Sequence, residues 1–265
     1  MREYCTPGSV RGRRATGVPT STSITKSMTK ILVWDIPARL LHWAFAAALM
    51  PALAISLLAD KERPLFQMHM LLGIVAVFLL AVRIALGLAG SRYSRFASFP
   101  VHPRELAGYL TSAVVSQTKL YTGNNPGSAM AAVLMFLLVP ALFISGIGYG
   151  GESMEELHDV LAWALLAVIV MHLMGLAWHT LRHQENISLA MVTGKKTGLP
   201  ENAIGSAHAV WGLIILIVAG LWITTLFAGY SEQAKAVKLP GLGVSLSLSE
   251  KESGEGKQKR DRDED

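Results

Sequence analysis

Four histidines in apolar segments are the residues of this sequence best suited to chemistry. They are His42, His69, His158 and His172. His158 and His172 lie fourteen residues apart in one segment. On an α-helix, that spacing puts two side chains about 40° apart around the axis and roughly 21 Å apart along it. One helix would then present imidazoles at two depths. His42 matches the depth of His172, and His69 matches that of His158, so the pattern predicts an inner pair and an outer pair.

Paired imidazoles at two levels are typical of a transmembrane electron-transfer protein. A neutral imidazole binds haem iron, and two of them fill both axial positions, which leaves no place for oxygen or substrate. The chain has one cysteine, Cys5, and no C-x-x-C-H stretch, which excludes covalent haem attachment. The sequence therefore predicts two b-type haems. We expect the second ring nitrogen of each ligand to donate to a carbonyl or carboxylate.

The same histidines have simpler interpretations. A single histidine inside a membrane often forms a hydrogen bond between helices. His179 lies seven residues after His172 on nearly the same face, so it competes for the inner site. The remaining histidines lie at or beyond the inner boundary, where we expect no ligation: His183, His208 and His102.

Two arginines lie close to the inner depth. Arg83 follows His69 by fourteen residues, and Arg39 precedes His42 by three. A charge at this depth needs a partner, and the propionates of the inner haem would supply one. The alternative is that both side chains reach the membrane interface.

The elements that position these residues are long apolar segments. The chain has 265 residues, of which 51% are hydrophobic and 16% are charged, whereas soluble domains are about 25% charged. Each segment can cross roughly 30 Å of hydrocarbon. This predicts an all-α transmembrane fold, a four-helix haem-binding bundle plus a fifth C-terminal transmembrane helix. The third span has no histidine and is expected to pack rather than ligate. The spans are residues 37–59, 65–89, 128–149, 156–180 and 209–228.

The flanking segments set the orientation and the domain limits. Lys and Arg gather before the first span and in alternate loops, which favours a cytoplasmic N-terminus. Residues 1–30 lack an apolar run, which excludes a cleaved secretory signal. We expect either a disordered basic segment here or a start of translation at Met28. We expect the dihaem membrane domain at 31–196, a linker and the fifth helix at 197–230, and a disordered charged tail at 231–265.

Several short stretches together resemble the bacterial cytochrome b561 and nickel–iron hydrogenase b-type subunit family. The resemblance covers residues 31 to 196, and the fourteen-residue spacing of His158 and His172 belongs to it. Family members often have Gly-His-Asn-Pro where this chain has Asn124, so we assign no ligand role to that loop. The matching stretches are VWDIPARLLHW (33–43), MHMLLG (68–73), GSRYSRF (90–96), GNNP (123–126) and MVTGKK (191–196).

The resemblance implies a function for the four histidines. It implies a four-helix core with two b-type haems ligated by His42, His69, His158 and His172. It also implies electron transfer across the bacterial inner membrane between the quinone pool and a periplasmic partner, a cytochrome c or a hydrogenase. The alternatives are a transporter that uses intramembrane histidines and a haem-free membrane anchor subunit. The transporter would need acidic residues at mid-depth, and the spans contain essentially none. The fifth helix lies outside the resemblance.

Overall fold

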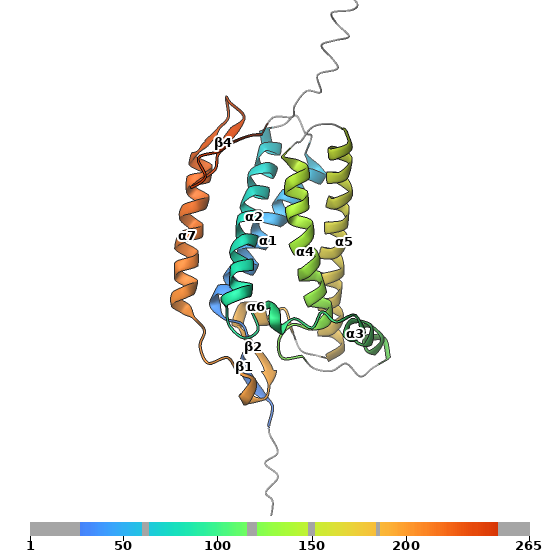
Figure 1. Cartoon of the computed structure of the whole chain (residues 1–265). Coiled ribbons are helices and arrows are strands. Elements are labelled where there is room, and N and C mark those ends of the chain that lie inside the picture. Colours follow the sequence, from blue (N-terminus) through green and yellow to red (C-terminus); the bar gives the residue numbers. More distant parts are fainter. Residues whose placement is uncertain (1–26, 60–63, 116–120, 148–151, 184–185, 249–265) are drawn as a thin grey trace, which may run out of the picture.

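Five long apolar helices make up the body of the protein in the computed structural model, which describes residues 27–59, 64–115, 121–147, 152–183 and 186–248. All five are long and apolar enough to cross a membrane, and they run side by side (Figure 1). They confirm the predicted spans with small shifts at the ends. The helices are α1 (Ile36–Leu58), α2 (Pro64–Ala89), α4 (Pro126–Gly146), α5 (Glu152–His183) and α7 (Ala209–Ala228).

Two of these helices begin at a side-chain cap followed by proline. The Asp35 carboxylate accepts from the Ala38 amide at 2.8 Å, and the Asn125 side chain accepts from the Ser128 amide at 2.7 Å. Asp and Asn are favoured at this position because they satisfy an amide that lacks a partner in the first turn. Proline just inside the start has the helical φ already and loses no helical hydrogen bond there. The starts of α1 and α4 are therefore encoded locally.

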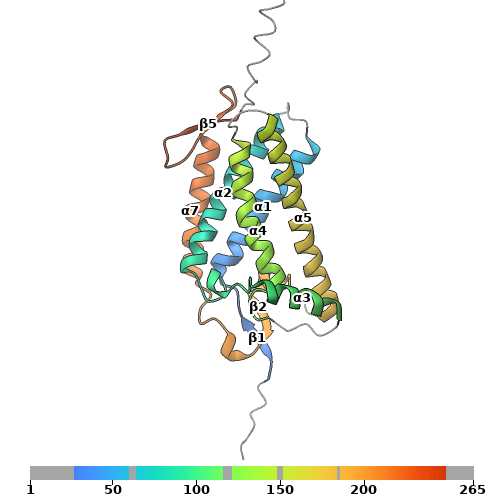
Figure 2. The same cartoon turned by 45° about the vertical axis from the view of Figure 1, so that its right-hand side comes forward.

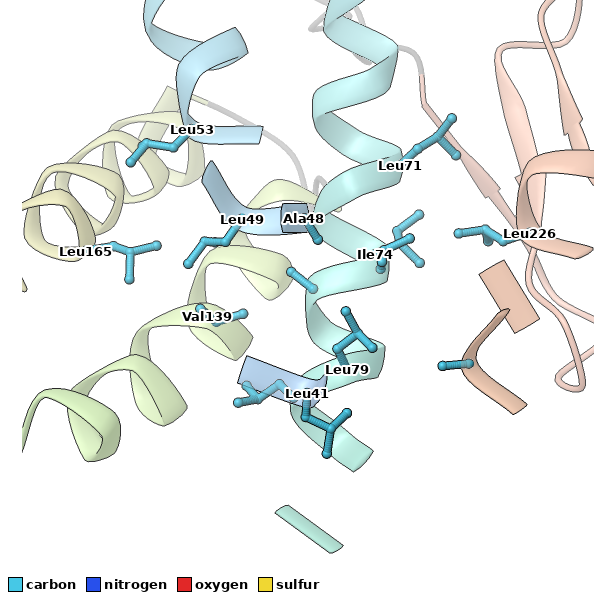
Figure 3. Close-up of a cluster of buried hydrophobic side chains, with 14 of the residues drawn as sticks. Leu41, Ala48, Leu49, Leu53, Leu71, Ile74, Leu79, Val139, Leu165 and Leu226 are labelled. Atoms are coloured by element: carbon cyan, nitrogen blue, oxygen red, sulfur yellow. The ribbon is translucent and has the colours of Figure 1, made fainter. Parts of the chain in front are cut away.

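The helices pack as two close pairs around an apolar core. α1 lies against α2, α4 lies against α5, and α2 also contacts α4. The core is formed by inward-facing leucine, valine, isoleucine and alanine side chains (Figure 3). Many large apolar side chains remain exposed on the outside, including Met174 and Leu221, as expected for a surface in contact with lipid. The labelled core residues include Leu41, Leu49, Leu53, Leu71, Ile74, Leu79, Val139, Leu165 and Leu226.

A small two-stranded sheet covers the end of the bundle where α1 begins (Figure 1). Strand β1 (Thr29–Leu32) pairs antiparallel with β2 (Lys195–Gly198), with Ile31 opposite Lys196. The turn between the short helix α6 (Ala190–Thr193) and β2 contains Gly194, whose φ is 78°. The carbonyl of Gly194 accepts from the amides of Val33 and Trp34. The prediction that residues 1–30 are disordered is thus wrong for residues 29 and 30, which belong to β1.

The loop between α2 and α4 contains a further helix, α3 (Pro103–Val115), which the sequence interpretation did not predict. α3 lies at the same end of the bundle as β1 and β2 and contacts α4 (Figure 2). Two short 3₁₀ helices also lie in connecting segments, η1 (Phe96–Ser98) and η2 (Pro200–Asn202).

The fifth long helix, α7, packs on α1 and α2. The rings of Trp222 and Phe78 stack with centroids 3.9 Å apart and an interplanar angle of 3°. Beyond α7, three short antiparallel strands form a sheet at the opposite end from β1: β3 (Tyr230–Ser231), β4 (Ala236–Lys238) and β5 (Ser245–Ser247). The Tyr230 hydroxyl donates to the side chain of Gln67 on α2.

This sheet corrects the prediction of a disordered tail from Ser231 onward. Val237 and Leu248 are buried against the main core. The strands are only two or three residues long, too short for an alternating pattern to identify them in the sequence. Residues 249–265 lie outside the described part of the chain.

Candidate functional site

The outer pair, His69 on α2 and His158 on α5, is brought together by the fold. The centroids of the two imidazole rings are 6.2 Å apart, and the ring planes make an angle of 76°. Two imidazoles bonded to opposite sides of one metal ion at about 2 Å have centroids about 6 Å apart. The separation of the outer pair therefore suits a single metal ion between the rings.

Backbone carbonyls orient both outer rings. His69 Nδ1 lies 2.8 Å from the carbonyl oxygen of Ala52 on α1. His158 Nδ1 lies 3.1 Å from the carbonyl oxygen of Leu142 and 3.1 Å from Ser145 Oγ, both on α4. When Nδ1–H donates to a carbonyl, the lone pair is on Nε2. This is the usual arrangement of a metal-binding histidine, whose second nitrogen donates to a carbonyl.

A glycine on α4, Gly146, allows the ring of His158 to lie close to this helix. A Cβ on Gly146 would lie 3.1 Å from Cε1 and 3.2 Å from Nδ1 of His158, tighter than ordinary contact. On α2, the ring of Phe66 stacks on His69 at 5.2 Å. The sequence predicts only that this span packs, and it misses Ser145 and Gly146. The feature of the sequence that could have identified them is a Ser-Gly pair at the membrane depth of His158.

The inner pair, His42 on α1 and His172 on α5, lies toward the other end of the bundle. His42 is within electrostatic range of both His172 and Arg83. Two residues near His42 on α1, Arg39 and Trp43, form hydrogen bonds to backbone carbonyls of α6. The Nε1–H of Trp43 donates to the carbonyl of Met191 at 2.9 Å, and Nη1 of Arg39 donates to that of Val192 at 2.5 Å. Arg39 thus fixes the first turns of α1, and its predicted propionate contact stays a prediction.

Arg83 lies within a set of three phenyl rings. Its guanidinium carbon is 5.8 Å from the ring centroid of Phe96, 6.0 Å from that of Phe99 and 5.8 Å from that of Phe136. Aromatic faces attract such a cation. Among the described residues, however, its buried Nη1 atom has no hydrogen-bond partner. Buried polar atoms are nearly always satisfied, so the geometry calls for an acceptor at Nη1.

Two neighbouring residues complete the surroundings of Arg83. A Cβ on Gly87 would lie 2.3 Å from Cζ of Phe96, so only glycine lets that ring close over α2. The buried Asp35 carboxylate attracts Arg83 and accepts from the Ser94 hydroxyl at 3.3 Å. Arg83 could be predicted from the sequence but its phenyl rings could not, because Phe96 and Phe99 come from one connecting segment and Phe136 from α4.

The other histidines are placed differently. His179 is buried further along α5. His102 and His208 are exposed in connecting segments at the inner end. The side chain of His183 lies outside the described part of the chain. The structure thus places the rings of His69 and His158 in contact and His42 within electrostatic range of His172; the ligand assignment of all four stays a prediction.

The histidines occur in pairs rather than in larger clusters. Across the described ranges, no group of three or more His, Cys, Asp or Glu side chains could hold a metal ion. Two protein ligands on opposite sides suit an iron whose other four ligands come from a porphyrin. A Cβ added to Gly73 or Gly175, close to His69 and His172 on their helices, would meet no atom within 4 Å. The residues present therefore fit haem.

Comparison with known proteins gives one result. A family model described as prokaryotic cytochrome b561 matches residues 33–194. The matched range contains all four paired histidines and ends before α7. No curated protein and no solved structure matches the chain.

Proposed function

Because the chain belongs to the prokaryotic cytochrome b561 family, whose members are membrane electron-transfer proteins that bind b-type haem, we propose that it holds two such haems. One is ligated by His69 and His158, and the other by His42 and His172. The five apolar helices make the protein a multi-pass membrane protein. On this proposal, its function is to carry electrons between the two faces of the bilayer.

The observation that best supports the proposal is the geometry of the outer pair. The ring separation of 6.2 Å suits one iron between the imidazoles. Both Nδ1 atoms contact backbone carbonyls, which would leave both Nε2 lone pairs available to bind a metal. An interhelical hydrogen bond between the two histidines would need no such orientation of both rings.

Each part of the chain then has a defined task. Bound between two histidines, a haem would supply a one-electron redox centre with no open coordination position. Helices α1, α2 and α5 hold the ligands, while α4 orients His158. The Nη1 atom of Arg83 is available to a propionate of the inner haem. The spacing along α5 separates the two levels by roughly 21 Å, so the bundle provides two positions for an electron along the membrane normal.

We further propose that the protein lies in the bacterial inner membrane with its N-terminus in the cytoplasm. The end near β1 carries Arg92, Arg95 and Lys195, whereas the first turns of α5 at the other end carry Glu152 and Glu155. This distribution follows the positive-inside rule. The proposed partners, suggested by the resemblance, are quinone and a periplasmic cytochrome c or hydrogenase.

The test is to count haems in histidine variants of the full chain purified in detergent. We expect two b-type haems per chain in the unaltered protein. His42→Ala or His172→Ala should leave one, and His69→Ala or His158→Ala should leave the other. Combining His42→Ala with His172→Ala should cost no more haem than either alone, because both ligands serve one site.

The control is His102→Ala, an exposed histidine in a connecting segment, which should keep both haems. Haem loss in this variant equal to that in His69→Ala would contradict the assignment. Absence of b-type absorption bands from the unaltered protein would refute the proposal itself.

A further inference from the structure

The two ligand pairs differ in how their rings are hydrogen bonded. In the outer pair, Nδ1 of His69 and Nδ1 of His158 both contact backbone carbonyls, at 2.8 Å and 3.1 Å. In the inner pair, neither the ring of His42 nor that of His172 has a hydrogen-bond partner within the described part of the chain. The outer histidines are therefore the more basic ligands, because a donated Nδ1 proton increases electron density on the ring.

This difference acts on the stability of the oxidised iron. A more basic axial ligand stabilises ferric iron, which has one more positive charge than ferrous iron. Hydrogen bonding to the ligands is one of the means by which a protein sets the potential of a haem. The outer site is expected to have the lower reduction potential on this ground alone.

The fixed charges near the two sites act in the same direction. The Nη1 atom of Arg83 is buried, and the charge of this residue acts on His42. A nearby positive charge favours the site that gains an electron. The outer site is flanked by carboxylates in the first turns of α5, on Glu152, Glu155 and Asp159. These carboxylates are exposed and largely screened, so Arg83 dominates.

Two other charged residues lie near the inner site. Asp35 attracts Arg83 and offsets part of its charge. Its carboxylate, however, accepts from the Ala38 amide and the Ser94 hydroxyl at the start of α1, so its negative charge is partly compensated there. Arg39 donates to the carbonyl of Val192 and adds positive charge on the same side. The described side chains on this side thus place two arginines, Arg83 and Arg39, against the single carboxylate of Asp35.

From these differences, we infer that the inner site holds the haem of higher reduction potential. An electron shared between the two haems then resides mainly between His42 and His172, at the end of the bundle that carries Arg83. This inference rests on the proposed binding of two haems. It assigns the order of the potentials and does not depend on which redox partner supplies the electron.

The deciding experiment is a redox titration of single-haem variants, followed by the absorption of the reduced haem. His42→Ala should keep only the outer haem, and His69→Ala only the inner one. We expect an electron to favour the inner haem over the outer one by at least about tenfold. This ratio corresponds to a difference of about 59 mV between the two reduction potentials for a one-electron couple. Equal or reversed potentials would overturn the inference while leaving the proposed function intact, whereas absence of haem from the unaltered protein would overturn both.

Variants of Arg83 test whether its charge raises the potential of the inner haem, in a protein that retains both haems. Arg83→Gln should lower the potential of the higher step and leave the lower step in place, while Arg83→Lys should retain most of the higher value. The control is Arg95→Gln, because Arg95 is exposed at the same end of the bundle and should be screened. A higher step that does not move in Arg83→Gln, or that moves equally in Arg95→Gln, would contradict the role given to Arg83.

Discussion

Replacement of Gly146 by alanine tests whether α4 positions the outer ligand. The new Cβ would lie 3.1 Å from Cε1 and 3.2 Å from Nδ1 of His158, where ordinary contacts are 3.4–4 Å. The ring must therefore move by a few tenths of an ångström away from α4. That movement lengthens the contact of 3.1 Å between Nδ1 and the Leu142 carbonyl, toward distances at which a hydrogen bond is lost.

The size of the effect follows from the packing. Inserting one methyl group into a filled contact costs about 1–3 kcal/mol. Since about 1.4 kcal/mol corresponds to a tenfold change in affinity, the outer site should bind haem about 5- to 140-fold more weakly. Rotation of the His158 ring would not relieve the clash at low cost. It would break the contacts of Nδ1 with Leu142 and Ser145, which lie on the same helix as Gly146.

The assay is haem titration into the full chain that carries His42→Ala, so that only the outer site binds. Gly146→Ala is then compared with Gly220→Ala, a helical glycine on α7 whose added Cβ would meet no atom within 4 Å. The control should bind haem as tightly as its parent. Equal affinity in Gly146→Ala and its parent would refute the conclusion that α4 sets the position of His158.

Two further predictions concern the elements around the site. Trp222→Ala removes the stack of the half-buried Trp222 on Phe78, whose centroids are 3.9 Å apart, and should lower the free energy of unfolding by about 1–3 kcal/mol. Trp222→Phe should recover part of this loss in a thermal unfolding assay, and an unchanged melting temperature in Trp222→Ala would show that α7 does not depend on the stack. Asp35→Ala removes the cap of α1 and should destabilise the protein by about 0.5–2 kcal/mol, whereas Asp35→Asn keeps an equivalent acceptor; equal loss in the two variants would point to the charge of Asp35 rather than to its capping bond.

The sequence by itself determined the helices and the levels of the four histidines. Apolar segments of this length have few alternatives to a membrane helix, because backbone amides in lipid must be satisfied within the segment. The spacing of His158 and His172 is a property of one helix, whose period fixes their relative direction and rise. For these reasons the spans and the two depths could be predicted without knowledge of the neighbouring helices.

Only the tertiary structure decided what surrounds each ring. The Leu142 carbonyl and Gly146 reach His158 because α4 packs beside α5. The three phenyl rings reach Arg83 from two segments, the one that contains η1 and Phe99, and α4. β1 pairs with a strand that lies more than 160 residues later in the chain. Helical periodicity does not specify which face of a helix meets which neighbour. That choice depends on side-chain packing between distant segments, and the asymmetry of the two histidine pairs arises there.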